Sequence, residues 1–185
     1  MWGPGFPVPI DTGRSMQALG LVWENLVHSG RNMREIRRPI LEPTHFGARL
    51  LLEHWWDKQC RGGIVVGRDL PTRATACVLR NLAVYEPVED GRDYRVRLAG
   101  AAFMRRFARE IGGLMLSQCL TAEKLDEQRT DLERAIAVGA PVMHDVRVMR
   151  GEEVHAEFET LHLRILAPGG VASWALGGVF YFDWA

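Results

Sequence analysis

Residues 93–113 read DYRVRLAGAAFMRRFAREIGG, and this stretch decides the fold. Apolar and polar side chains alternate from Asp93 to Leu98, and this period of two predicts a strand with one buried face and one solvated face. Gly100 ends the alternation. A strand followed at once by a different periodicity indicates an α+β chain.

The second half of the stretch has a helical period. Phe103, Met104 and Phe107 recur at spacings of one, three and four residues, with arginines between them, so we expect a short amphipathic helix. The pair Gly112-Gly113 follows. Glycine adopts the positive φ that ends many helices, so the pair is predicted to close this one.

The chain before this stretch is predicted to hold an arm, two helices and a linker. Residues 1–13 are rich in proline and glycine and are expected to be an arm, and residues 14–28 carry one apolar stripe typical of a helix. Four arginines in residues 31–38, followed by Pro39 and Pro43, are interpreted as a solvated linker, with a phosphate-facing patch as the alternative.

The elements between this linker and residue 93 follow in short order. A second amphipathic helix is predicted over residues 44–60, with Thr44 as its N-cap. A short helix over 72–79, a strand over 82–88 and a turn at 89–91 complete a hairpin with the opening strand.

The chain after residue 113 is predicted to contain one helix and three antiparallel strands. The helix covers residues 122–138, with Thr121 as its N-cap. The strands begin at Val142, at Val154 and at Val171, and glycine-containing turns separate them.

This pattern resembles a bacterial subfamily of PAS domains. Its members often run Tyr/Phe-Arg-x-Arg-Leu-x-Gly into a short helix that ends in a Gly-Arg/Lys-x-x-x-Gly turn, and Ala108 replaces the first glycine of that turn here. The subfamily also begins with a Trp-containing helix, a Gly-rich break and an Arg-x-Asp-x-x-Pro-like segment. The corresponding residues here are Trp55-Trp56, Gly62-Gly63 and Arg68-Asp69-Leu70-Pro71.

The resemblance covers about residues 46–184 and implies an α+β fold. It implies a five-stranded antiparallel sheet in the order 2-1-5-4-3, with the connecting helices on its concave face. The expected domains are an N-terminal arm and amphipathic helix over 1–43 and a PAS-like domain with its leading helix over 44–185. A cystatin-like cone is the competing fold, but it leaves the hairpin over 82–98 unexplained.

Composition narrows the classes of partner. Lys+Arg 23 and Asp+Glu 23 give a formal net charge of zero, so we expect neither nucleic acid nor a membrane as a partner. Cys60, Cys77 and Cys119 form no CxxC pair, which argues against a disulfide framework and a zinc site. The proline-rich start lacks a signal-peptide pattern, so a cytoplasmic protein is predicted.

No constellation typical of catalysis is visible, so the chain is predicted not to be an enzyme. The acidic residues after Asp145 are scattered, and the Gly-rich pieces lack the lysine of a phosphate loop. His155 and His162 fall on opposite faces of one strand and cannot share a metal. Cys119 lacks the Asn-Cys-Arg-Phe-Leu-Gln motif of flavin-binding PAS relatives, and the sequence identifies no cofactor.

The strongest candidate site is aromatic. One face of the last predicted strand carries Trp174, Leu176, Phe180, Phe182 and Trp184. Gly178 leaves a gap between them that is either a ligand cavity or a place of close packing. The predicted pocket lies between the concave sheet face and the helices. Its expected lining residues are Tyr94, Phe103, Phe107, Leu132, Ile136, His144 and Trp174.

The resemblance implies a small-molecule sensor or a dimerisation module. Because the sequence ends soon after the last strand, we expect a stand-alone sensory or regulatory protein that binds a small ligand and signals to an output protein. A ligand-free structural module is the alternative. His144 is expected to be a core histidine or a ligand contact, but not a haem ligand, and the helix over 14–28 is predicted to form a homodimer.

Overall fold

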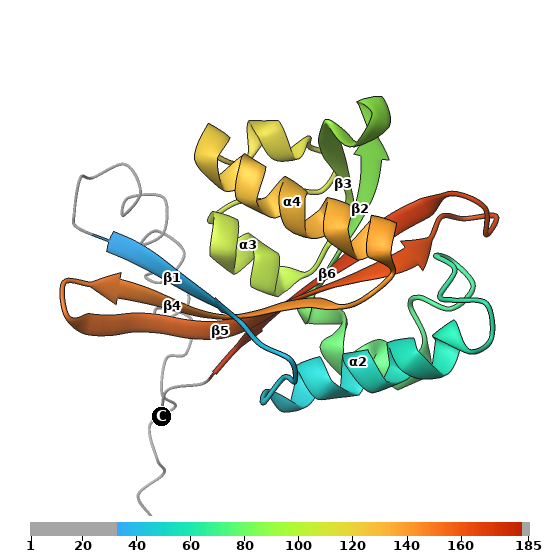
Figure 1. Ribbon diagram of the computed structural model, residues 1–185, viewed down its shortest axis with the longest axis horizontal. Coiled ribbons are helices and arrows are strands. Elements are labelled where there is room, and N and C mark those ends of the chain that lie inside the picture. The colour runs from blue at the N-terminus through green and yellow to red at the C-terminus, as the bar shows by residue number, and fades with distance from the viewer. Residues whose placement is uncertain (1–32, 183–185) are drawn as a thin grey trace, which may run out of the picture.

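An antiparallel sheet runs through the centre of the protein in the computed structural model, which describes residues 33–182 (Figure 1). Its six strands lie in the order β1-β4-β5-β6-β2-β3. The strands are β1 Met33–Pro39, β2 Leu82–Val88, β3 Asp93–Ala99, β4 Val142–Arg150, β5 Glu153–Leu166 and β6 Ser173–Tyr181.

Helices cover both faces of the sheet, so the α+β class is confirmed. Helix α2, Phe46–Gln59, lies against one face, and helices α3, Ala101–Phe107, and α4, Ala122–Val138, lie against the other (Figure 1). Three short 3-10 helical segments lie in the connections between these helices and strands. These segments are η1 Arg73–Asn81, η2 Glu89–Gly91 and η3 Leu116–Gln118.

The predicted count of five strands, and with it the order of the whole sheet, is wrong because β1 was interpreted as a linker. All seven residues of Met33–Pro39 pair with β4, from Met33 opposite Arg150 to Pro39 opposite His144. The strand therefore belongs to the sheet, although the predicted domain boundary at residue 44 places it outside.

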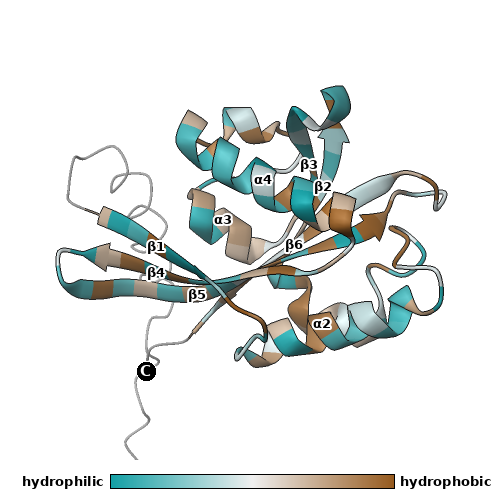
Figure 2. Ribbon diagram, in the orientation of Figure 1, coloured by the Kyte–Doolittle hydropathy of each residue, from teal (hydrophilic) through white to brown (hydrophobic). Residues whose placement is uncertain are grey.

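Strand β1 lacks the usual apolar pattern because its inward-facing side chains are charged. These side chains pair with opposite charges on the helices. Glu35 lies 3.6 Å from the Arg106 guanidinium of α3 and 3.8 Å from the Lys124 ammonium of α4. Arg37, two residues later, faces carboxylates of α4. Charged inward-facing residues are typical of edge strands, which must avoid pairing with other chains. Figure 2 shows hydrophilic residues along much of β1 and α4.

Two hydrophobic layers, one on each face, hold the sheet between the helices. The layer beneath α2 is built around Leu51, Trp55, Leu161, Leu163, Leu176 and Phe180. The layer beneath α3 and α4 is built around Tyr85, Tyr94, Phe103, Leu116, Leu132 and Phe158. Successive side chains of a strand point to opposite faces, so β6 and the part of β5 from Phe158 onward are buried on both faces.

Two helix ends differ from their predictions. Helix α3 ends at Phe107 rather than at Gly112-Gly113, because Ala108 itself adopts the left-handed conformation, with φ 54°. Helix α2 has His45 as its N-cap rather than Thr44, and the His45 imidazole accepts a hydrogen bond from the Gly47 backbone N–H at 3.0 Å. Helix α4 has its predicted bounds and ends at Gly139, also left-handed.

The left-handed Ala108 predicts a stabilising substitution. A side chain at positive φ is strained and glycine is not, so Ala108→Gly should raise the free energy of unfolding by about 0.5–1 kcal/mol. Ala137 is an exposed residue inside α4. Ala137→Gly is the matched control and should lower the same free energy by about 0.5–1 kcal/mol. Urea denaturation followed by circular dichroism measures both, and effects of the same sign would refute the assignment.

Several predictions concern residues that the structure does not describe. The arm over 1–13, the helix over 14–28 with its proposed dimer contact, and Trp184 lie outside the described residues 33–182. Within that described range, no helix combines the length and the apolar character needed to cross a membrane.

Candidate functional site

Most of the predicted pocket residues meet, but they meet as packed core. Tyr94, Phe103 and Leu132 are each at most 3% exposed in the layer beneath α3 and α4, and Phe107 and Ile136 pack against them. These side chains fill the space in which the ligand was expected. His144 lies on the same face of the sheet, beside α4.

Trp174 lies on the opposite face, so its predicted place in that pocket is wrong. Trp174, Leu176 and Phe180 share a face as expected, but this face is covered by α2. A Cβ atom on Gly178 would come within 2.5 Å of the Phe180 ring and 3.5 Å of Leu51. The gap at Gly178 is therefore a place of close packing, which was one of the two alternatives.

A different cleft opens beside Trp174. It has a volume of about 230 Å³, and the residues that line it come from β2, β3, β6, η1 and two loops. Nine of them are apolar and one is charged. The lining residues of this Trp174 cleft are Val66, Leu70, Pro71, Leu79, Leu82, Val84, Arg97, Leu98, Pro168 and Trp174.

Arg97 is the one charged residue of the Trp174 cleft. Its guanidinium carbon lies 5.8 Å from the centre of the Trp174 ring, within the range of a cation–π interaction. The Glu86 carboxylate lies 3.6 Å away, and the Arg97 side chain is 47% exposed. No hydrogen bond joins Arg97 side-chain atoms to another residue in the range 33–182, so its N–H donors have no protein acceptor there.

One wall of the cleft is stabilised by the hydrogen bonds of a buried carboxylate. Asp69, 7% exposed, accepts hydrogen bonds from the Val65 backbone N–H at 3.0 Å, from Arg68 at 2.8 Å and from Lys58 at 3.0 Å. Burial alone would raise the pKa of Asp69, but these donors and the nearby cations lower it to about 2. The wall formed by Val66, Leu70 and Pro71 is thereby fixed at neutral pH.

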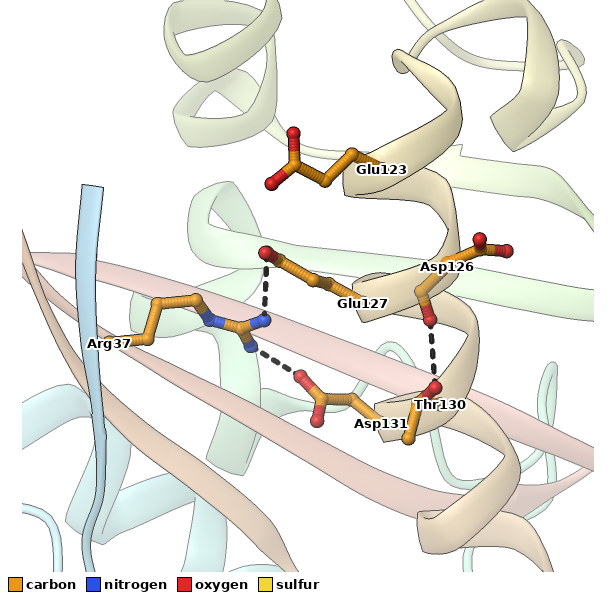
Figure 3. Close-up of a pocket in the computed structure, with 6 residues that line it drawn as sticks. All are labelled: Arg37, Glu123, Asp126, Glu127, Thr130 and Asp131. Carbon is orange, nitrogen blue, oxygen red and sulfur yellow. Dashed lines mark hydrogen bonds and ion pairs between the residues drawn. The ribbon is translucent and has the colours of Figure 1, made fainter. Parts of the chain in front are cut away.

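A second, polar cleft lies between β1 and α4 (Figure 3). Its volume is about 500 Å³, and it opens widely to solvent. Arg37 reaches from β1 toward α4, where it pairs with Asp131 and lies 3.4 Å from the Glu127 carboxylate. The lining residues are Arg37, Glu123, Asp126, Glu127, Thr130 and Asp131.

Two histidines lie beneath this polar cleft. The Arg37 guanidinium is 3.2 Å from Nδ1 of His144, and since arginine only donates, His144 is neutral with its proton on Nε2. Nε2 of His162 lies 2.8 Å from the Gln128 amide nitrogen. Within residues 33–182 the buried Nδ1 of His162 and Oγ1 of Thr160 have no hydrogen-bond partner.

Both histidines are held neutral. Burial is the largest cause that lowers the pKa of His144, and the Arg37 and Arg134 charges lower it further, while Asp131 acts in the opposite direction. Burial lowers the pKa of His162 to about 4. The pairs of Arg37 with Asp131 and Glu127 join α4 to the sheet at β1, and we call this group of residues, with the two histidines beneath it, the clamp.

This clamp predicts a loss of stability in mild acid. The folded pKa of His162, about 4, is below its unfolded value, so the unfolded chain takes up a proton first as the pH falls. The free energy of unfolding should have its full value above about pH 6.5 and should be lower by about 2 kcal/mol at pH 5. Urea denaturation at pH 7.5 and pH 5 measures the change. His162→Gln should reduce this pH dependence, and an unchanged dependence would refute the assignment to His162.

The chemistry of the two clefts differs. In the described residues, no group of three or more histidine, cysteine, aspartate or glutamate side chains is placed to hold a metal ion. Most groups that line the polar cleft already have partners, and among the described residues Glu123 is the exception. The Trp174 cleft presents apolar walls and a partly free cation, which is the composition of a ligand site.

The sequence indicated only part of these sites. Trp174 was recognised from the aromatic run, whereas Arg97 was interpreted only as the solvated face of its strand, and Arg37 and Asp131 were not recognised as partners. A signal for Asp131 existed: it lies one helical turn before Ala135 on α4, and a charge on that side of the helix needs a partner.

Comparison with known proteins adds no relative. Neither protein-family models nor curated proteins match the sequence, and no solved structure matches the fold.

Proposed function

We propose that this chain is a PAS-like sensory or regulatory module that binds a small ligand in the Trp174 cleft and signals through protein contacts. Two features support the proposal, one in the order of the strands and one in the cleft itself. The signal, the output partner and the dimer contact of residues 14–28 belong to the same proposal.

The order of the strands supports the proposal that the module is PAS-like. If β2 is counted as the first strand and β6 as the fifth, the sheet from the β3 edge to β4 has the order 2-1-5-4-3. Strand β1 is then an additional strand at the other edge. Helices α3 and α4 lie between β3 and β4 in the chain and pack on one face. This is the arrangement that the resemblance implies for a PAS domain.

The observation that carries ligand binding is the position of the Trp174 cleft. Its floor is made by Leu82 and Val84 of β2 and by Trp174 of β6, strands that are hydrogen bonded to each other. Helix α2 packs on the same face through Trp55, whose indole N–H donates to the Arg164 carbonyl at 2.7 Å. A ligand in the cleft would therefore touch the face of the sheet that positions α2.

Native mass spectrometry of the purified full chain tests the proposal. We expect a fraction of molecules to carry a small noncovalent adduct that denaturation releases. Leu79→Trp should reduce that fraction because the larger side chain occupies the cleft. An adduct that is unaffected by this substitution, while the variant remains folded, would place the ligand elsewhere.

A ligand-free interaction module is the second candidate. The packed layer beneath α3 and α4 favours it, because the expected internal pocket is filled. Phe46 and Trp56 of α2 are 67% and 52% exposed, and exposed aromatic side chains are typical of contact surfaces. A full chain that never carries an adduct, yet forms a homodimer in analytical ultracentrifugation, would support this candidate.

A further inference from the structure

We propose that the ligand of the Trp174 cleft is a small monocarboxylate with a compact apolar body. The inference rests on the proposed function and adds the chemical class of the ligand. The apolar body would contact the walls of the cleft, and the carboxylate would bind the Arg97 guanidinium at its opening.

The size and walls of the cleft select the apolar body. A volume of about 230 Å³ equals the liquid volume of about eight water molecules, so the cleft accepts one ring or a short branched chain rather than a nucleotide. The walls carry aliphatic side chains, two prolines and the Trp174 ring, 8% exposed. A polar body would lose its hydration there without gaining hydrogen bonds.

Arg97 indicates that the polar group of the ligand is negatively charged. A guanidinium presents five N–H donors in a planar fork that matches a carboxylate, and the contact with Glu86 at 3.6 Å is longer than a hydrogen bond. The fork therefore has donors free for a second carboxylate. No acidic side chain between residues 33 and 182 lines the cleft, which disfavours an amine.

Backbone hydrogen bonds hold the walls of the cleft in place. The Val66 N–H donates to the Leu166 carbonyl at 3.0 Å, and the Ala167 N–H donates to the Ala172 carbonyl at 2.8 Å. These bonds fix the loop that carries Val66, Leu70 and Pro71 and the loop that carries Pro168. The remaining lining residues belong to β2, β3, β6 and η1. A preformed site requires little ordering on binding, so even a small ligand gains measurable affinity.

The test is a titration of the full chain, followed by nuclear magnetic resonance of its backbone and indole N–H groups. Benzoate is the probe, benzamide is its neutral isostere and benzylamine is its cationic counterpart. The indole N–H of Trp174, assigned with Trp174→Phe, should shift in a saturable way with benzoate. Benzamide and benzylamine should bind at least about tenfold more weakly.

Substitutions on β3 distinguish a specific role of Arg97 in binding from a general effect of the charge of the protein. Arg97→Met keeps the aliphatic stem and should weaken benzoate binding about tenfold or more, with benzamide binding unchanged. Arg97→Lys keeps the charge and should retain part of the affinity. Arg95 is exposed on the same strand and outside the cleft, so Arg95→Met is the control and should bind benzoate like the original chain.

Each remaining outcome counts against the inference. Equal binding of benzoate and benzamide, or unchanged binding by Arg97→Met, would overturn the carboxylate class and leave ligand binding in the cleft intact. Equal losses in Arg97→Met and Arg95→Met would show a general charge effect and overturn the role of Arg97. No shift with any of the three probes would overturn the carboxylate class. The effect of Leu79→Trp on the adduct in native mass spectrometry would then show whether the cleft itself is the ligand site.

Discussion

Replacing Gly100 by alanine should lower the free energy of unfolding by about 3 kcal/mol, the upper part of the usual range for overpacking a core. Gly100 joins β3 to α3, and its N–H donates to the Leu82 carbonyl at 2.8 Å. An added Cβ would come within 2.5 Å of the Leu79 carbonyl oxygen and would also meet the Arg80 carbonyl. Backbone atoms cannot rotate away as side chains do, so η1 or α3 must move.

The control for Gly100 is a second glycine in the same stretch. A Cβ on Gly112 would meet only the flexible Glu110 carboxylate at 3.6 Å. Gly112→Ala should therefore change stability by less than about 0.5 kcal/mol. Urea denaturation of both variants gives the two values, and equal effects would show that the contact with η1 does not determine the requirement for glycine at position 100.

Replacing Glu159 by methionine should destabilise the protein by a similar amount, about 3 kcal/mol or more. Glu159 is 2% exposed on β5, and its carboxylate accepts from the Thr44 backbone N–H at 2.7 Å, the Thr44 hydroxyl at 2.7 Å and the His45 N–H at 3.1 Å. Methionine has similar length but removes the acceptor. Three donors at the start of α2 would then lose their partner.

Glu157 provides the matched control on the same strand face. It pairs with Arg147 at 2.7 Å, and the Arg147 side chain is 43% exposed. The Glu157 side chain is 19% exposed, but solvent reaches its partner Arg147 and screens the ion pair, so Glu157→Met should cost much less than Glu159→Met. Unfolding curves followed by tryptophan fluorescence measure both variants. A loss for Glu157→Met as large as that for Glu159→Met would argue against a special role of Glu159 in docking α2.

Elements with a clear periodicity could be predicted from the sequence. Helix α4 combines an apolar stripe with a glycine stop, and the hairpin of β2 and β3 combines alternation with a turn. Strand β1 was missed because its inward side chains, Glu35 and Arg37, are charged. Their partners lie on helices about 70 to 95 residues away in the chain, so no local pattern identifies them.

The candidate site was predicted less well for a geometric reason. A period of two shows which residues of β6 share a face, but it does not show which helix covers that face. Trp174 was therefore assigned to the side of α4, whereas α2 covers it. The cleft beside Trp174 also depends on Pro168 and on the loop that carries Val66, Leu70 and Pro71, and long-range contacts place that loop.

The most direct test of the ligand site is a set of isotope-filtered nuclear Overhauser measurements on the full chain saturated with benzoate. Leu79 and Leu82 line the Trp174 cleft, while Leu132 and Ile136 lie beneath α4 on the other face. We predict contacts from the benzoate ring to the methyl groups of Leu79 and Leu82. Contacts to Leu132 and Ile136 instead, or to neither pair, would contradict ligand binding in the Trp174 cleft.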